Sequence, residues 1–246
     1  MTKIIIVGPA SPLRGGISDF NEALAKSLTV KGYLVEIISF SLQYPKFLFP
    51  GKSQNRVEQT ENFKFKISPL INSINPISWW RTAKYIKRKN PNKVFIRFWM
   101  PFFAPCLGVI GGYLKKNKIP VYGIVDNAVA HEKRLGDAIL VNYFLNKCKS
   151  HFTLSEKVKQ DIYKINNSVS VESLFHPIYN TYSKITDKDS ALKRLNLKEG
   201  KYILFFGLIR KYKGLDLAIK AMSNKSIIKK NIKLIIAGEF YDSEEK

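Results

Sequence analysis

One stretch near the carboxyl end limits most strongly what this chain can fold into. It begins with a continuous apolar run from Tyr202 to Phe206, which is typical of a strand buried on both faces of a parallel sheet. Gly207 ends the run, and apolar residues then return with the spacing of one helical face, at Leu215, Ala218, Ile219 and Met222. The sequence therefore predicts a strand, a loop and a helix, the repeating order of an α/β fold.

The loop between this strand and helix is basic, because it carries Arg210, Lys211 and Lys213. Cations and the free N–H groups of a helix start would meet at the end of a strand, which suits a bound phosphate. The alternative is that these cations are solvated charges of an ordinary loop.

The residues of this loop also resemble a known family. From Phe205 to Asp216 the chain runs Phe-Phe-Gly-Leu-Ile-Arg-Lys-Tyr-Lys-Gly-Leu-Asp, which resembles the opening of the donor-binding domain in family 4 glycosyltransferases, retaining enzymes of GT-B fold. The resemblance implies that Arg210 and Lys213 hold the diphosphate of a nucleotide sugar, beside the helix start at Gly214. One difference is that many members carry the arginine directly after the glycine, where this chain has Leu208.

Further apolar runs alternate with helical patterns along the rest of the chain. Strands are expected at residues 3–8, 33–40, 93–98, 120–125, 150–154, 169–174 and 232–238, with a shorter one at 63–67. The expected fold is α/β and GT-B-like: a Rossmann-like parallel-sheet domain over 1–178, on the acceptor side, and a partial second Rossmann-like domain over 179–246. By the resemblance, the nucleotide-sugar-binding domain is incomplete, because it would continue for about another hundred residues.

A loop with paired glycines follows the first strand. Gly15 and Gly16 lie just before a helical face that begins at Ile17, and glycine there lets backbone approach a ligand or adopt positive φ. A purely structural turn explains the pair almost as well. The spacing from Gly8 to Gly16 is not that of the dinucleotide fingerprint. The resemblance implies a substrate-binding role for both paired glycines.

Polar residues gather where the strand at 120–125 ends, and this edge is where an α/β sheet usually places its chemistry. Asp126 and Asn127 follow at once, with His131 and Glu132 a few residues later. The family often has His-Asn here and then His-Glu, so Asp126 replaces the first histidine. Asp126 could accept hydrogen bonds from sugar hydroxyls. We expect His131 and Asp126 to be catalytic and Asn127 and Glu132 to bind substrate, although His131 could be a structural loop histidine.

The formal net charge of +22 raises the question of an anionic partner. Only eight of the 41 basic residues are arginine, and no nucleic-acid recognition motif is present, so nucleic acid is not an expected partner. Basic residues interleaved with aromatic ones favour an anionic membrane surface instead. Trp79 and Trp80, in a helix expected over residues 76–89, are either core residues or side chains at a lipid interface.

Other features limit the cofactor and the compartment. Cys106 and Cys148 lack metal-ligand spacing and are expected to be reduced, buried thiols, and with three histidines no metal site or cofactor is expected. The start of the chain leads straight into a strand rather than a signal peptide, and residues 98–114 are expected to form a buried helix. These features predict a cytoplasmic protein that could also lie at the inner face of the cell membrane.

Together with the resemblance, these features predict a metal-independent glycosyltransferase of hexosyltransferase type, and the resemblance alone implies that it is retaining. It would move a sugar from a nucleotide-sugar donor to a saccharide or lipid-linked acceptor in cell-surface polysaccharide synthesis. The alternative is a truncated, non-catalytic chain whose N-terminal domain binds only an acceptor or a partner enzyme.

Overall fold

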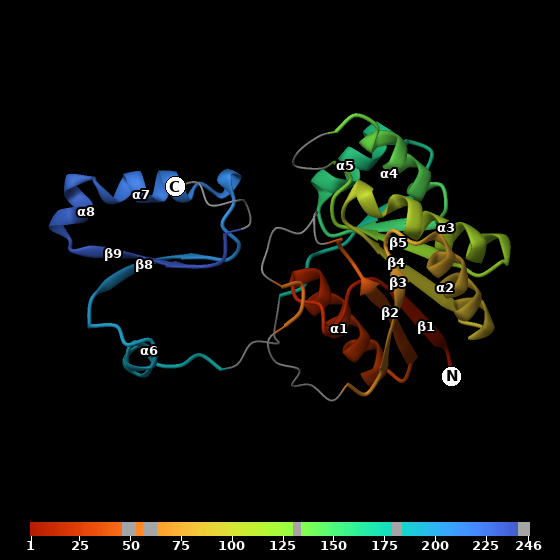
Figure 1. Cartoon of the computed structure of the whole chain (residues 1–246), viewed down its shortest axis with the longest axis horizontal. Helices are drawn as coiled ribbons and strands as arrows, with labels where there is room; N and C mark the ends of the chain where they lie inside the picture. Colours follow the sequence, from red (N-terminus) through yellow and green to blue (C-terminus); the bar gives the residue numbers. More distant parts are fainter. Residues whose placement is uncertain (46–52, 57–62, 130–133, 179–183, 241–246) are drawn as a thin grey trace. The chain divides into compact units, whose positions relative to one another are not determined.

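The computed structural model describes residues 1–45, 53–56, 63–129, 134–178 and 184–240. Their contacts divide the chain into two compact units, the first over Met1–Pro45 and Gln54–Ile178 and the second over Lys46–Ser53 and Tyr179–Lys246. Each unit has its own parallel sheet (Figure 1).

The first unit is built on a seven-stranded sheet. Its strands are β1 (Lys3–Val7), β2 (Leu34–Leu42), β3 (Lys66–Asn72), β4 (Lys93–Phe98), β5 (Val121–Val125), β6 (Ser150–Thr153) and β7 (Val171–Ser173). Every neighbouring pair is parallel, and the spatial order is β3-β2-β1-β4-β5-β6-β7. The order reverses between β1 and β4, and such a switch point opens a crevice at the carboxyl ends of these two strands.

Helices cover the two faces of this sheet unequally (Figure 1). The helices of the unit are α1 (Gly16–Val30), α2 (Pro76–Arg88), α3 (Ala104–Lys116), α4 (Asp137–Leu145) and α5 (Glu156–Ile165), with a short 3-10 turn η2 (Pro101–Phe103) before α3. Side chains of α2 to α5 join the larger core cluster, and those of α1 join a smaller cluster formed with Ile6, Val35 and Ile37. The two clusters lie on opposite faces because neighbouring residues of a strand point to opposite sides.

Most sequence predictions for this unit are confirmed. The apolar segment after β4 is a buried helix, with Leu107, Ile110 and Leu114 fully buried in α3. Within the described part of the chain, no helix has the length and apolar character needed to cross a bilayer. Cys106 and Cys148 are free, buried thiols, and burial raises the pKa of each to about 12.

One prediction is corrected, and one alternative that the sequence left open is resolved. The strand expected at 63–67 lies later, at Lys66–Asn72, because its partner β2 pairs with Ile71, which is fully buried, rather than with Phe63. The two neighbouring tryptophans differ: Trp79 packs on the core and its Nε1 donates to the carbonyl oxygen of Asn72, whereas Trp80 is 49% exposed.

The second unit contains one parallel strand pair and its connecting helices. Its elements are α6 (Lys188–Arg194), β8 (Lys201–Phe206), the 3-10 turn η3 (Lys211–Lys213), α7 (Leu215–Met222), α8 (Lys225–Lys229) and β9 (Ile232–Ala237). The strands pair in register from Lys201 with Ile232 to Phe206 with Ala237.

The prediction that β8 is buried on both faces is wrong. Leu204 is 59% exposed and Phe206 is 78% exposed, and Ile209, at 7% exposed, is the one buried residue among those of this unit that the structure describes. The reason is that two strands and a single helical layer provide too few neighbours to cover both faces of a strand.

Candidate functional site

The switch point of the first unit is closely packed around Gly8, the residue after β1. A Cβ at this position would lie 2.7 Å from Nδ2 of Asn21 and 2.9 Å from Cβ of Arg97. Glycine therefore lets α1 and β4 approach the end of β1. Asn21 Oδ1 is buried and has no partner among the described residues, although its Nδ2 donates to the Pro9 carbonyl oxygen at 2.9 Å.

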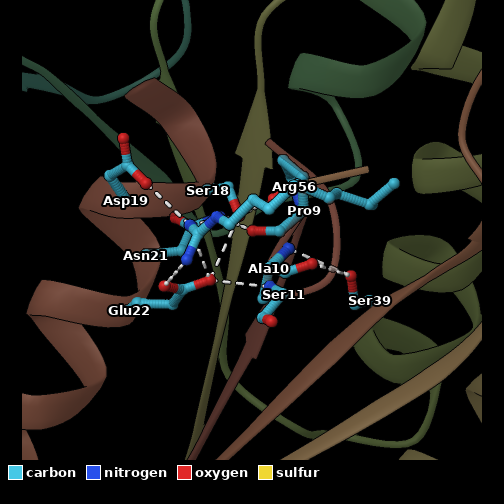
Figure 2. Close-up of polar contacts among 10 residues, drawn as sticks. Pro9, Ala10, Ser11, Ser18, Asp19, Asn21, Glu22, Ser39 and Arg56 are labelled. Atoms are coloured by element: carbon cyan, nitrogen blue, oxygen red, sulfur yellow. Dashed lines mark hydrogen bonds and ion pairs between the residues drawn. The ribbon is translucent and has the colours of Figure 1, made fainter. Parts of the chain in front are cut away.

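A polar network holds the loop that follows (Figure 2). Glu22 of α1 is 8% exposed, and its Oε1 accepts from the Ser11 backbone N–H at 2.6 Å and from Ser18 Oγ at 3.2 Å. Arg56 links Glu22 to Asp19. Its Nη1 lies 3.0 Å from Glu22 Oε2, and its Nη2 lies 2.6 Å from Asp19 Oδ1. This network fixes the loop on the side that faces α1, because a buried carboxylate accepts bonds from a backbone N–H and a cation together.

The paired glycines lie at the end of this loop and are exposed. Gly15 precedes α1 with φ 121° and ψ 160°, a conformation that a side chain rarely adopts, and Gly16 is the first residue of the helix. A Cβ on Gly15 would meet nothing within 4 Å, so the backbone angles rather than a lack of space require glycine here. Both predicted residues thus lie at the carboxyl edge of the sheet with open backbone.

The strand β4, which lies beside β1 in the sheet, supplies a buried ion pair that the sequence motifs did not indicate. Arg97 of β4 is 3% exposed, and its Nε donates to Asp126 Oδ2 at 2.6 Å while its Nη2 donates to Asp126 Oδ1. Asp126 directly follows β5, and its backbone N–H donates to the Phe98 carbonyl oxygen at 2.8 Å. The available signal was a single arginine within the apolar run of residues 94–99, since a charge there needs a partner.

Two aromatic rings flank this ion pair. The Arg97 guanidinium carbon lies 4.1 Å from the centroid of the Phe20 ring, which belongs to α1, and Phe20 packs edge-on against His176 at 5.9 Å. Burial raises the pKa of Asp126 above its ordinary value, while Arg97 and then His176 act in the opposite direction. His176 therefore contributes to the electrostatics of Asp126.

The remaining predicted residues of this edge are placed only in part. Asn127 is half-buried directly after Asp126. His131 and Glu132 lie outside the described residues. Gly15, Gly16, Asp126 and Asn127 therefore all lie at the carboxyl edge of one sheet, where Asp126 can accept hydrogen bonds and Arg97 holds it in place. Arg97 Nη1 is buried without a partner among the described residues, so both of its N–H groups remain to donate.

The loop predicted to bind phosphate lies in the second unit, where β8 and β9 end. The backbone of this loop continues the strand pairing, since Gly207 N–H donates to the Ala237 carbonyl oxygen at 2.9 Å and Ile209 N–H to that of Glu239 at 2.8 Å. A Cβ at Gly238 would lie 2.0 Å from the Gly207 carbonyl oxygen. Only glycine at 238 therefore permits this close approach.

The side chain of Lys213 lies beside the end of β8. Its Nζ would lie 3.5 Å from a Cβ at Gly207, so the ammonium group is beside the backbone at the strand end. Gly214 has φ 72° and precedes α7, and it offers no side-chain cap to the first N–H groups of that helix. Arg210 is half-buried and precedes the 3-10 turn that carries Lys213. An ammonium group, an arginine and an uncapped helix start together form a positive region suited to a phosphate.

This architecture is similar to that of known proteins, although the sequence is not. No family model matches the sequence, and no curated protein matches it. Solved structures do match: an alpha-glucosyltransferase in complex with UDP and DNA has a TM-score of 0.56 at 10% identity, over 96% of this chain and 56% of that chain. MurG from Acinetobacter baumannii has a TM-score of 0.51 at 11% identity, over 96% of this chain and 66% of its own.

Epimerases match as well as transferases. The UDP-N-acetylglucosamine 2-epimerase from Rickettsia bellii has a TM-score of 0.50 at 12% identity, over 97% of this chain. The present chain spans 62% of the length of that epimerase. The chain has a GT-B-like fold. The predicted fold class is thus confirmed, whereas membership of family 4 and a retaining mechanism stay predictions, because identities this low show the fold alone.

Proposed function

We propose that this chain is a nucleotide-sugar-dependent glycosyltransferase whose second unit binds the diphosphate of the donor. The observation that carries the proposal is the position of Lys213, whose ammonium group lies over the glycine that ends β8, next to the uncapped start of α7. The structural neighbours whose names include UDP support the choice of a nucleotide as the ligand.

The proposed chemistry follows from charge. When the glycosidic bond to the donor breaks, negative charge grows on the departing nucleoside diphosphate. Fixed positive groups stabilise that charge more in the transition state than in the ground state, and Lys213, Arg210 and the α7 start are the groups available. In the first unit, Asp126 would accept hydrogen bonds from hydroxyl groups of a saccharide or lipid-linked acceptor, with Gly15 and Gly16 offering backbone beside it.

The finer parts of the proposal rest on the sequence resemblance. They are membership of family 4, retention of anomeric configuration, transfer without a metal ion and a place in cell-surface polysaccharide synthesis. His131 would provide a polar contact at the reacting centre, and Glu132 and Asn127 would contact substrate.

The proposal can be tested by titrating UDP into the full chain and into a Lys213→Gln variant by calorimetry. A hydrogen bond to a charged phosphate contributes about 1.5–3 kcal/mol, so the variant should bind roughly tenfold to a hundredfold more weakly. Lys220→Gln is the matched control, because Lys220 is an exposed lysine in the last turn of α7, the helix that follows Lys213. Equal affinity in wild type and Lys213→Gln would refute the assignment.

A second candidate is a chain that binds an acceptor or a partner enzyme without catalysing transfer. The observation in its favour is the open apolar surface of the second unit, where Leu204 is 59% exposed and Phe206 is 78% exposed. Such a surface favours self-association. Light scattering separates the two candidates, because a monodisperse monomer that binds UDP supports the first and a dimer or aggregate without UDP binding supports the second.

A further inference from the structure

One helix of the first unit presents a surface that the proposed transfer reaction does not use. The helix α2 begins with a good N-cap, since Asn75 Oδ1 accepts from the Ile77 N–H at 3.0 Å and Pro76 occupies the first turn. Its inner side contributes Thr82, Ala83 and Ile86 to the core. These contacts fix the rotation of the helix and therefore which side chains face outward.

The outward side is both basic and apolar. Ile77 is 62% exposed and Trp80 is 49% exposed. The exposed cations on the same side are Arg81, Lys84, Lys87 and Arg88. At about 100° per residue, these six side chains fall within an arc of about 120°, opposite the buried residues. We call these six residues the α2 face.

The charge of the α2 face is not balanced locally. From residue 62 to residue 125 the chain contains no Asp or Glu and twelve Lys or Arg. In the part of the chain that the structure describes, no ion pair involves the four cations of the α2 face. Four cations without acidic partners on one side of a helix create a positive potential that attracts an anionic partner.

A groove lies beside these cations. It has a volume of about 600 Å³ and is lined by Arg81, Lys84, Lys87, Arg88 and Tyr113, the last from the neighbouring helix α3. Cations and a phenol around one hollow suit a phosphate group, since both donate hydrogen bonds to its oxygens. The groove and the α2 face therefore form a continuous anion-binding surface.

The aromatic residue indicates which anionic partner fits. Lys84 Nζ lies 3.4 Å from the centroid of the Trp80 ring and covers one face of the indole. A nucleic-acid base therefore cannot stack on that face. Such stacking on an exposed aromatic ring is how proteins bind single-stranded nucleic acid. The edge of the Trp80 ring suits the boundary between lipid headgroups and acyl chains. Ile77 and Ile74 are nearby in sequence, and Ile74 is 52% exposed.

We propose that the α2 face docks on a membrane surface containing anionic phospholipids. Phosphate headgroups bind Arg81, Lys84, Lys87 and Arg88, and the Trp80 ring and Ile77 enter the interfacial layer. The binding is peripheral and reversible, because it rests on one helix side and on charges that salt screens. It is independent of the donor loop of the second unit.

The test is flotation of the full chain with vesicles of phosphatidylcholine alone and of phosphatidylcholine with about 30% phosphatidylglycerol. We expect binding to the second kind only. Each cation contributes about fivefold, so an Arg81→Gln, Lys84→Gln, Lys87→Gln, Arg88→Gln variant should bind at least roughly a hundredfold more weakly. A matched variant, Lys220→Gln, Lys225→Gln, Lys229→Gln, Lys230→Gln, removes four exposed cations from the second unit and should bind like wild type.

Two further measurements keep the proposal open to refutation. Bromine-labelled lipid should quench wild-type fluorescence more than that of Trp80→Phe, because Trp80 is the tryptophan at the interface. Circular dichroism of each variant checks that α2 still forms. The proposal is wrong if the control variant loses as much binding as the α2 variant, if Trp80→Phe is quenched as strongly as wild type, or if single-stranded RNA binds wild type while anionic vesicles do not.

Discussion

Arg97 and Asp126, 29 residues apart, form a two-bonded ion pair between the end of β4 and the residue after β5, and the arginine is 3% exposed. The pair lies at the carboxyl edge of the sheet, where we propose that Asp126 accepts hydrogen bonds from an acceptor. Charge that is buried in this way is costly unless both partners are present. The pair therefore controls both the stability of this edge and the ionisation of its carboxylate.

Removing the cation should be more harmful than removing both charges. Arg97→Met leaves Asp126 buried without its partner and should lower the free energy of unfolding by about 3–5 kcal/mol. The double variant Arg97→Met, Asp126→Leu should recover much of that loss, because no uncompensated charge remains. Urea unfolding of the two single variants, the double variant and wild type measures this coupling. Additive losses would show that the two residues do not act as a pair.

The Glu22 network should be needed for an ordered loop after β1. Glu22→Gln places an amide where the Ser11 N–H and Arg56 require an acceptor, which should cost about 1–3 kcal/mol. Hydrogen exchange of the amides of residues 9–16 should accelerate. Asp19→Asn is the matched control, since it contacts the same Arg56 but its side chain is 50% exposed, and its effect should stay below about 1 kcal/mol. Faster exchange in the control than in Glu22→Gln would contradict this account.

Gly238 should be essential to the loop proposed to bind the donor. Gly238→Ala forces Cβ against the Gly207 carbonyl oxygen, so the ends of β8 and β9 must separate and Lys213 loses its position. We expect UDP affinity to fall at least about tenfold and stability to fall by about 1–3 kcal/mol. Gly200→Ala serves as control, because a Cβ there would make an ordinary contact of 3.5 Å with Tyr202. Comparable UDP binding in both variants would remove the role of Gly238.

His151 should make the first unit less stable in mild acid. Burial lowers the pKa of this histidine from 6.5 to about 4, and its Nδ1 lies 3.3 Å from the Ser170 carbonyl oxygen. Between these values the unfolded chain binds a proton that the folded chain does not, so stability is fully present above about pH 6.5 and falls as the pH drops toward 4. The loss between about pH 7 and pH 5 should be about 2 kcal/mol.

The check is the pH dependence of urea unfolding in wild type and in His151→Gln. The variant lacks the titrating ring, so its unfolding free energy should change less between the two pH values. Asp126, whose pKa is raised by burial, contributes with the opposite sign, but it is present in both proteins and cancels in the comparison. Parallel pH profiles would show that His151 is not the group responsible.

Most helices and strands, and the polar residues at their ends, could be predicted from local sequence patterns. Continuous apolar runs predicted the strands, and helical spacing predicted α1, α2, α3 and α7, because the side-chain periods of 2 and 3.6 are local properties of the backbone. Glycines before helices and polar residues after strands also pointed to Gly15, Asp126 and Lys213. The prediction of an α/β, GT-B-like fold followed from these patterns together with the resemblance of residues 205–216.

The tertiary structure decided which distant residues meet. Glu22 and Arg56 are 34 residues apart, and they meet because the Arg56 segment pairs with the loop after β1, where the Arg56 N–H donates to the Pro12 carbonyl oxygen. Arg97 and Asp126 meet because the strand order places β4 beside β5. Periodicity carries no information about that order, so the sequence could not pair these side chains. The exposure of Leu204 and Phe206 was missed for the same reason, because burial depends on which neighbours surround a strand and not on its own apolar character.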